Sequence, residues 1–280
     1  MSTSIVLRRR LATELRALRH KAGLSQEAVA EHLSAAVSKI VRIENAQSTV
    51  SVGDLRALLA LYEVPAQDQE QLIDLARNAR KRGGWWSSYR DLLPGKYVAL
   101  EAEASKIFNY ETSFIPGLLQ TPDYARALIS TDRRLHSEDV PRFVEIRMTR
   151  QTRLWAETPS LTLHALIDEA ALRRCIGGPA VMRAQLEALC DAMRRPNIEI
   201  GVIPLSAEAY PSFGIPFAIL RFTDPRDPDV VLVEGCGERY FEEAEDVALF
   251  RADWADIKRV ATFGEESHKL IEHLIKEIAP

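Results

Sequence analysis

Apolar positions in the first 80 residues recur at helical spacing and predict a series of short helices. One stripe is formed by Leu11, Leu15 and Leu18, and it ends at Gly23, a residue type that commonly stops a helix. A second helix is expected to begin after Ser25, whose hydroxyl can cap a helix N-terminus. Two later stripes predict a fourth and a fifth helix, with core positions Leu55, Leu58, Leu59 and Tyr62 in one and Leu72, Ile73 and Leu75 in the other.

The stretch EHLSAAVSKIVRIENA, residues 31 to 46, is predicted to contain two helices joined by a tight corner. Helix propensity alone favours one continuous helix, because neither Gly nor Pro interrupts the stretch. The apolar stripe that reaches Leu33, however, does not continue at the same spacing. We therefore expect a corner at Ser34 and Ala35 and a second helix over residues 36 to 45. Ser34 occupies a position where glycine would most easily supply a positive φ.

One face of this second helix mixes apolar, hydroxyl and cationic groups, which is typical of a DNA contact and not of a core. Two short helices joined by a tight corner can project the second into the major groove. Val37 is suited to a thymine methyl group and Ser38 to base-edge donors or acceptors. Lys39 would reach phosphates, and Arg42 either a phosphate or a guanine. The predicted DNA-binding residues are Gln26, Ala36, Val37, Ser38, Lys39, Val41, Arg42 and Asn45, with Gln26 contacting phosphate.

Beyond about residue 83 the pattern changes to a mixture of strands and helices. A cationic run, a Gly-Gly pair and two tryptophans mark the change, so we expect domains at residues 1–82 and 83–280. The runs LTLHALID, NIEIGVIPL, GIPFAILRF and DVVLVEG predict four strands. Helical spacing occurs in residues 117–130, 137–157, 177–196, 244–261 and 265–278. The expected fold class is an all-α, five-helix domain containing a helix-turn-helix, followed by a mixed α+β domain.

Composition and charge narrow the function. With 46% hydrophobic and 27% charged residues the chain has the balance of a globular protein. No apolar run is long enough to span a bilayer, and the N-terminus lacks a secretion signal, so we expect a cytoplasmic protein that does not bind membranes. The net charge is -4, yet residues 1–82 hold 13 basic and 9 acidic side chains. This asymmetry indicates a polyanion partner for the first domain.

The sequence offers no convincing catalytic, metal or cofactor site. Cys175, Cys190 and Cys236 form no metal-binding pattern and are expected to be buried free thiols. Asp168 and Glu169 follow a predicted strand, but they are better explained as the acidic start of a helix. We therefore expect no enzyme activity and no cofactor.

A family resemblance adds to this interpretation. Residues 15–46 resemble the repressor-type helix-turn-helix of the XRE (xenobiotic response element) family, which has two helices at this point. Departures are Ser34 and Ala46, where the family usually has glycine, and Ala36, where a capping Ser or Thr is common. The matching positions are Gly23, Leu24, Ser25, Gln26, Glu27, Ala30, Leu33, Ser38, Ile43, Glu44 and Asn45.

Segments of the second region, among them IDEAALRR and RPNIEIGVIPL, resemble the C-terminal region of actinobacterial XRE regulators known as antitoxin-like. This resemblance implies transcriptional control, often with a small partner protein encoded nearby. We therefore expect a sequence-specific DNA-binding transcription regulator that acts as a homodimer on an inverted-repeat operator and binds a partner protein or ligand through its second domain. Two alternatives stay open. One is an antitoxin-like protein that neutralises a small partner and regulates its own synthesis, and the other is a DNA-tethered enzyme.

Overall fold

The structure is a computed structural model that describes residues 4–80, 84–89, 91–93, 95–158, 160–235 and 237–278. It divides into two units, the first comprising Met1–Glu103 with Thr223–Pro228 and the second Ala104–Phe222 with Asp229–Pro280. Residues 81 to 83, on which the predicted junction rests, lie outside the described residues. The domain boundary expected at that point therefore stays a prediction.

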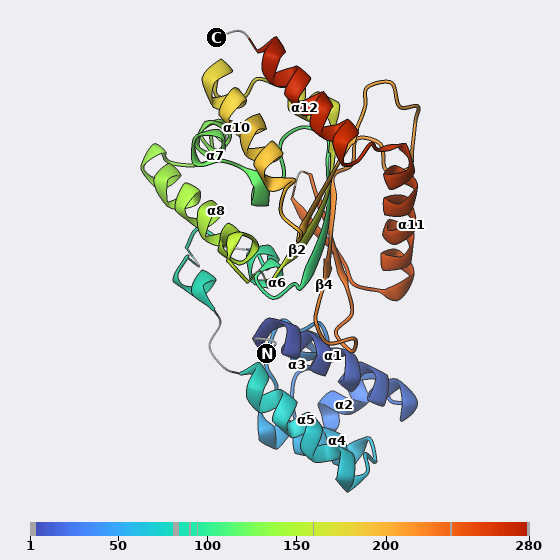
Figure 1. Cartoon of the computed structure of the whole chain (residues 1–280). Coiled ribbons are helices and arrows are strands. Elements are labelled where there is room, and N and C mark those ends of the chain that lie inside the picture. The colour runs from blue at the N-terminus through green and yellow to red at the C-terminus, as the bar shows by residue number, and fades with distance from the viewer. Residues whose placement is uncertain are drawn as a thin grey trace. The chain divides into compact units, whose positions relative to one another are not determined.

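Helices dominate the first unit (Figure 1). Its first 80 residues form α1 (Ser4–Lys21), α2 (Gln26–His32), α3 (Val37–Glu44), α4 (Val52–Leu61) and α5 (Ala66–Ala79). Their inward-facing side chains share one hydrophobic core, in which Val29, Ile40 and Leu55 are buried. The core positions predicted for the fourth helix, Leu55, Leu58, Leu59 and Tyr62, are all buried, so the helical spacing is confirmed there.

Two short helical segments follow α5 in the described part of the chain. Trp85–Tyr89 form a 3-10 helix, η1, and Tyr97–Glu101 form α6. Trp85 and Trp86 are half-buried and meet edge to face, with ring centroids 6.3 Å apart. Gly84 allows this arrangement, because a Cβ at that position would lie 2.3 Å from the Trp86 ring. The paired tryptophans therefore pack locally against each other and against this glycine.

A mixed six-stranded sheet forms the centre of the second unit. The strand order is β3 (Ile198–Ile203), β2 (Thr162–Asp168), β1 (Lys106–Glu111), β4 (Phe217–Arg221), β5 (Val230–Glu234) and β6 (Glu238–Phe241). The first three of these run parallel to one another, and β4 pairs with β1 in the antiparallel sense. The four predicted strands correspond to β2, β3, β4 and β5. The two strands that were not predicted are the central strand β1 and the edge strand β6.

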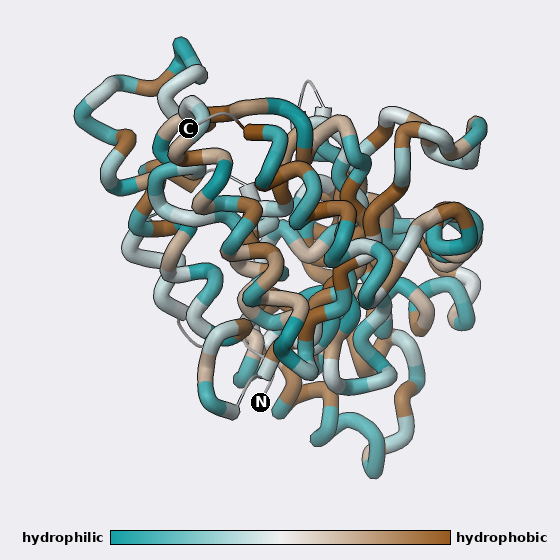
Figure 2. Tube along the Cα trace, turned by 45° about the horizontal axis from the view of Figure 1, so that its top comes forward, coloured by the Kyte–Doolittle hydropathy of each residue, from teal (hydrophilic) through white to brown (hydrophobic). Residues whose placement is uncertain are grey.

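Helices cover both faces of the sheet (Figure 1). On one face lie α7 (Pro122–Ile129), α8 (Val140–Trp155) and α10 (Pro179–Ala192), and on the other lies α11 (Ala244–Val260). The remaining elements are η2 (Gly117–Leu119), η3 (Ser137–Asp139), α9 (Glu169–Arg173) and α12 (Glu265–Glu277). Figure 2 shows hydrophobic positions concentrated along the strands and alternating with hydrophilic positions along the surrounding helices. The mixed α+β fold class is therefore confirmed.

The cysteines differ from one another in exposure. Cys190 is a buried free thiol in α10, as expected. Cys175 is exposed, so the expectation of burial is wrong for this residue. It lies in the turn between α9 and α10, two residues before Gly177, where the chain is not part of an apolar helix face. Cys236 lies outside the described residues.

The length and hydropathy of a helix decide whether it can cross a membrane. Over the described ranges, no helix combines the length and the apolar character that crossing a membrane requires.

Candidate nucleic-acid interface

The corner between α2 and α3 has the geometry that the sequence predicts. Leu33 ends α2, and Ser34 adopts a left-handed conformation with φ 48°. Backbone bonds close the corner, since Ser34 N–H donates to Glu31 O at 3.0 Å and Ala35 N–H to Ala30 O at 2.9 Å. Ala36 stands at the N-cap of α3 and makes no side-chain capping bond. The two-helix interpretation is confirmed, and so is the missing cap.

The exposed face of α3 carries most of the predicted contact residues. Val37, in the first turn of α3, is 37% exposed. The opposite face is anchored in the core by Ile40 and Ile43. Of the predicted residues, Ala36, Val37, Ser38, Arg42 and Asn45 are exposed, whereas Gln26, Lys39 and Val41 are half-buried. Whether these residues contact DNA stays a prediction.

A buried ion pair fixes α3 to α1. Arg19 Nε donates to Glu44 Oε1 at 2.7 Å and Arg19 Nη2 donates to Glu44 Oε2 at 3.0 Å. Only 7% of Arg19 and 3% of Glu44 is exposed. Burial acts to raise the pKa of Glu44, but hydrogen bonds from Arg19 and Gln26 outweigh it and leave that pKa lowered. Because breaking such a pair leaves an uncompensated buried charge, the orientation of α3 is strongly fixed.

The side chain of Gln26 belongs to the same network. Its Nε2 donates to Glu44 Oε2 at 2.8 Å, so α2 is connected to the end of α3. The predicted phosphate contact of Gln26 would need the side chain amide to leave this carboxylate or to share it. Within the first unit, Gln26 therefore positions the two helices of the corner.

Lys39 also has a partner in the first unit. Its Nζ lies 3.0 Å from Asp54 Oδ2, near the N-terminus of α4. The hydrogen bond from Lys39 is the largest cause that lowers the pKa of Asp54, followed by the hydrogen bond from Ser51. By contrast, the exposed Arg42 guanidinium has no hydrogen-bond or ion-pair partner among the described residues. Arg42 is therefore the more available cation of the two.

Several cations of α1 are engaged within the first unit and do not form a free basic patch. Arg10 Nε donates to Asp227 Oδ1 at 2.6 Å, and its Nη2 lies 2.8 Å from Asp224 Oδ2. Arg16 Nη2 donates to Glu44 O at 2.9 Å, at the end of α3. The positive balance predicted for the first domain is consequently smaller at the surface than a count of side chains indicates.

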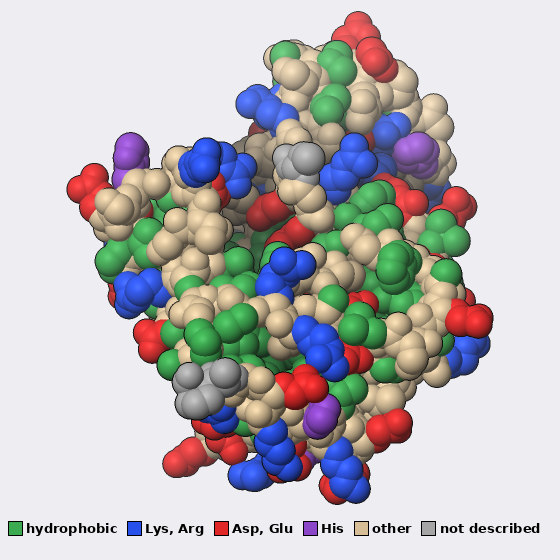
Figure 3. Space-filling view, turned by 90° about the horizontal axis from the view of Figure 1, so that it is seen from above, with side chains coloured by type: hydrophobic (Ala, Val, Ile, Leu, Met, Phe, Trp, Pro, Cys, Tyr) green, Lys and Arg blue, Asp and Glu red, His purple; other side chains and the backbone are tan. Residues whose placement is uncertain are grey.

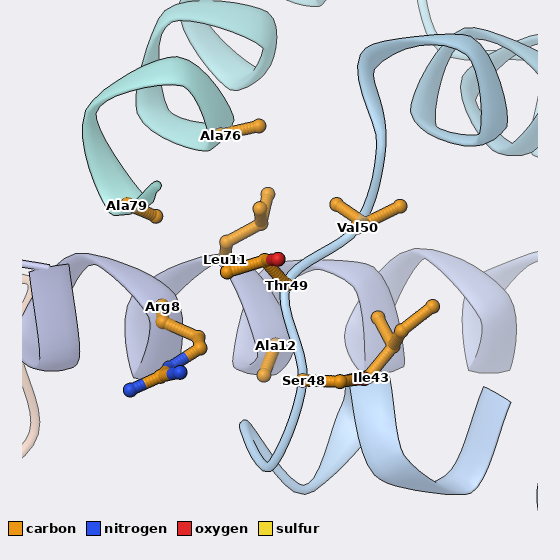
Figure 4. Close-up of a pocket in the computed structure, with 9 residues that line it drawn as sticks. All are labelled: Arg8, Leu11, Ala12, Ile43, Ser48, Thr49, Val50, Ala76 and Ala79. Atoms are coloured by element: carbon orange, nitrogen blue, oxygen red, sulfur yellow. The ribbon is translucent and has the colours of Figure 1, made fainter. Parts of the chain in front are cut away.

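A small pocket lies beside α1 (Figure 4). Its lining is mostly apolar and comes from α1, α3, the segment that follows α3, and α5: Arg8, Leu11, Ala12, Ile43, Ser48, Thr49, Val50, Ala76 and Ala79. Arg8 supplies the charged group of this pocket, and its Nε is buried with no hydrogen-bond partner in the part of the chain that the structure describes. Burial lowers the pKa of Arg8. The pocket is lined by helix-packing residues and lacks a constellation of reactive side chains.

The acidic residues considered as catalytic candidates have structural partners. Asp168 is the N-cap of α9, and its Oδ1 accepts a hydrogen bond from Ala170 N–H at 2.8 Å. Glu169 is buried and accepts hydrogen bonds from Arg173 Nε at 2.7 Å and from Leu205 N–H at 2.9 Å. The interpretation of this pair as a helix start is confirmed. Among the described residues, no group of three or more His, Cys, Asp or Glu side chains is placed to hold a metal ion.

The helix pair α2–α3, its tight corner and the exposed face of α3 define a helix-turn-helix, the class of module that presents a helix to DNA. In agreement, residues 10–72 match the helix-turn-helix domain family. Residues 94–273 match a domain of unknown function, DUF5753, over more than half of the chain, and the protein belongs to that family. No curated protein and no solved structure matched the chain.

Proposed function

We propose that the protein is a sequence-specific DNA-binding transcription regulator whose α3 enters the major groove. The observation that carries this proposal is the exposed face of α3, where Val37, Ser38 and the unpaired Arg42 lie on a helix fixed from behind by the Arg19–Glu44 pair. A rigidly held helix loses little conformational freedom on binding. Short side chains at its start allow the helix to approach base edges closely.

The contact residues have different roles in this proposal. Val37 packs against a thymine methyl group, Ser38 bonds to a base edge, and Arg42 bonds to guanine or to a phosphate. Lys39 contacts phosphate only after leaving Asp54, which is 3.0 Å away in the free protein. The backbone and side chains at Gln26, Ala36, Val41 and Asn45 shape the surface around these groups.

Binding to a random pool of duplexes, with selection of the bound fraction, tests the proposal. The full chain should enrich one sequence, and Arg42→Ala should lose about 1 to 3 kcal/mol of discrimination at one base pair, because the guanidinium that reads it is gone. Lys39→Ala should instead weaken all sequences alike and lower the salt slope by about one unit.

Arg77→Ala provides the matched control for this experiment. Arg77 is an exposed cation of α5 that pairs with Glu70 and Asp74, so the variant changes the net charge equally without touching α3. Its binding should equal that of the parent protein. If no sequence is enriched, or if Arg42→Ala and Arg77→Ala behave alike, α3 does not read DNA.

For the second unit we propose a binding role without catalysis. The carboxylates that follow β2 are occupied in capping and positioning α9 and the segment after β3, which supports this assignment. In this proposal a partner or ligand alters DNA binding by favouring one conformation of the regulator over another.

A further inference from the structure

Glu111 is the last residue of the central strand β1, and only 7% of it is exposed. Its Oε1 accepts a hydrogen bond from Asn109 Nδ2 at 3.4 Å, which is long and therefore weak. Its Oε2 is buried and has no hydrogen-bond partner among the described residues. A carboxyl group in such a place costs free energy, since an unsatisfied buried polar atom loses its bonds to water without replacement.

The position of Glu111 in the sheet is one where α/β proteins bind ligands. From β1 the chain continues to β2 and β3 on one side, and then crosses to β4 on the other side of β1. In open α/β sheets, ligands bind outside the carboxyl ends of the parallel strands. Here those ends belong to β1, β2 and β3, because β4 runs antiparallel to β1. In Figure 1 the parallel strands run upward, so that their carboxyl ends lie at the top of the sheet. Seen from above in Figure 3, this face has a hollow in which Asp and Glu side chains lie, and both hydrophobic side chains and Lys and Arg side chains border it.

The charges around Glu111 decide which kind of ligand fits. Burial is the main cause that raises its pKa, to about 8, and the negative charge of Glu234 on β5 raises it further. Arg147 on α8 acts in the opposite direction, but more weakly than Glu234. Arg147 is also engaged with Gln120, to whose Oε1 its Nη1 donates at 2.9 Å. Of these two charges the negative one acts more strongly on Glu111, and the unpartnered Oε2 is an acceptor, so a cation with a hydrogen-bond donor fits this position better than an anion or a neutral acceptor.

Within the described ranges, Glu111 offers one oxygen without a hydrogen-bond partner, and this restricts the kinds of cation that could bind to it. A guanidinium group prefers two parallel bonds, one to each oxygen of a carboxylate, and at Glu111 only Oε2 is without a partner in the described structure, so its second bond would have to share Oε1 with Asn109. A metal ion needs several ligands, and the described residues offer no set of three that could hold one. A primary ammonium group needs only one strong acceptor and can use its other N–H donors toward Glu234 or solvent.

We propose that the carboxyl edge of β1 is a binding site for a small molecule with a primary ammonium group, which donates an N–H to Glu111 Oε2. This inference rests on the ligand-binding part of the proposed function and names the site and the ligand class. On binding, the protonated Glu111 gives up its proton to solvent and the resulting carboxylate pairs with the ammonium. One bound ligand therefore releases about one proton at neutral pH.

Calorimetry of the full chain with n-butylammonium as the probe tests the site. At pH 7 the parent protein should show saturable binding, with a heat that depends on the ionisation enthalpy of the buffer because a proton is released. Tetramethylammonium has the same charge but no N–H donor, and it should bind at least about tenfold more weakly. Glu111→Gln should weaken n-butylammonium binding by a similar factor.

Glu238→Gln serves as the matched control, because Glu238 is an exposed residue of β6 that pairs with Glu234 of β5. It should bind the probe as the parent does. A ¹³C NMR titration of the parent protein needs no variant, and the Glu111 carboxyl signal should titrate at a lower pH when n-butylammonium is present.

Three results would overturn the proposal: no saturable binding to the parent, equal binding of the two cations, or no effect of Glu111→Gln. Each result leaves the DNA-binding role intact, since Glu111→Gln is expected to bind DNA as the parent does when no probe is present. Loss of sequence selection by the parent would instead contradict the proposed function itself.

Discussion

At the scale of single residues, Glu111 makes the stability of the second unit depend on pH. Its pKa rises from 4.5 to about 8 on folding, so between these values the folded protein holds a proton that the unfolded chain has released. The free energy of unfolding therefore decreases as pH rises through this window, by at most about 1.4 kcal/mol per pH unit, and levels off above it.

Glu111→Gln should remove this contribution, because the amide stays neutral at every pH. We expect the variant to gain stability over the parent as pH increases from 5 to 9, as measured by urea unfolding at several pH values. A difference that stays constant over this range would show that Glu111 does not hold the proton.

Residue types at the predicted interface could be recognised from the sequence, but their partners could not. Val37, Ser38 and Arg42 are exposed as a reading face requires. Gln26 and Lys39, whose predicted partner is phosphate, bond to Glu44 and Asp54 in the protein without DNA. Asp54 lies 15 positions after Lys39, beyond the range of helical periodicity, so no local pattern could connect the two. The buried pair of Arg19 and Glu44 escapes pattern reasoning for the same reason, because both residues look like surface charges in sequence.

At the scale of elements, the corner between α2 and α3 contains backbone strain that a glycine would relieve. Ser34 has φ 48°, in a region that costs a residue with a Cβ about 1 kcal/mol. Ser34→Gly should therefore raise the free energy of unfolding of the first unit by about 0.5 to 1 kcal/mol, in spite of the greater freedom of glycine in the unfolded chain. The measurement is chemical denaturation followed by circular dichroism.

Ala35→Gly is the appropriate comparison for this variant. Ala35 is the neighbouring corner residue and does not have a positive φ. There, glycine adds freedom to the unfolded chain without relieving strain, so the variant should be less stable than the parent. Equal effects of the two substitutions would contradict the assignment of strain to Ser34.

The apolar pattern of the sequence predicts the elements in which that pattern is regular, but it does not predict the short edge strand β6 or the central strand β1. The strands β2 to β5 carry runs of aliphatic residues, and the helices keep their spacing. In contrast, β1 places Asn109 and Glu111 on the same face as Ile107, in the middle of the sheet. Because two of the three inward positions are polar, β1 lacks the apolar periodicity by which a central strand is recognised in a sequence. The polar residues that break the apolar pattern of β1, Asn109 and Glu111, are also the residues at the proposed ammonium site.

At the scale of the whole molecule, we expect the protein to bind DNA as a homodimer on an inverted repeat. The motivation is the small reading surface of α3, which has 8 residues and can contact only a few base pairs. Dimer symmetry should appear in the operator as two half-sites about 10 base pairs apart, centre to centre. Footprinting checks the half-sites, and sedimentation velocity checks the mass of the protein in solution. One protected half-site combined with a monomeric mass would refute it.

The strand order also determines when each part of the protein can fold during synthesis. The helices of the first 80 residues make mostly local contacts, which form quickly once the segment has left the ribosome. The central strand β1 must wait much longer for its partner β4. The side chain of Asn109 bonds to the backbone of Phe217 on β4, and that residue is synthesised 108 residues after Asn109. At typical translation speeds this delay lasts roughly 10 seconds, during which one edge of β1 remains unpaired. The helix-turn-helix is therefore folded on the nascent chain while the sheet of the second unit is still incomplete, and chaperone contacts should concentrate on β1.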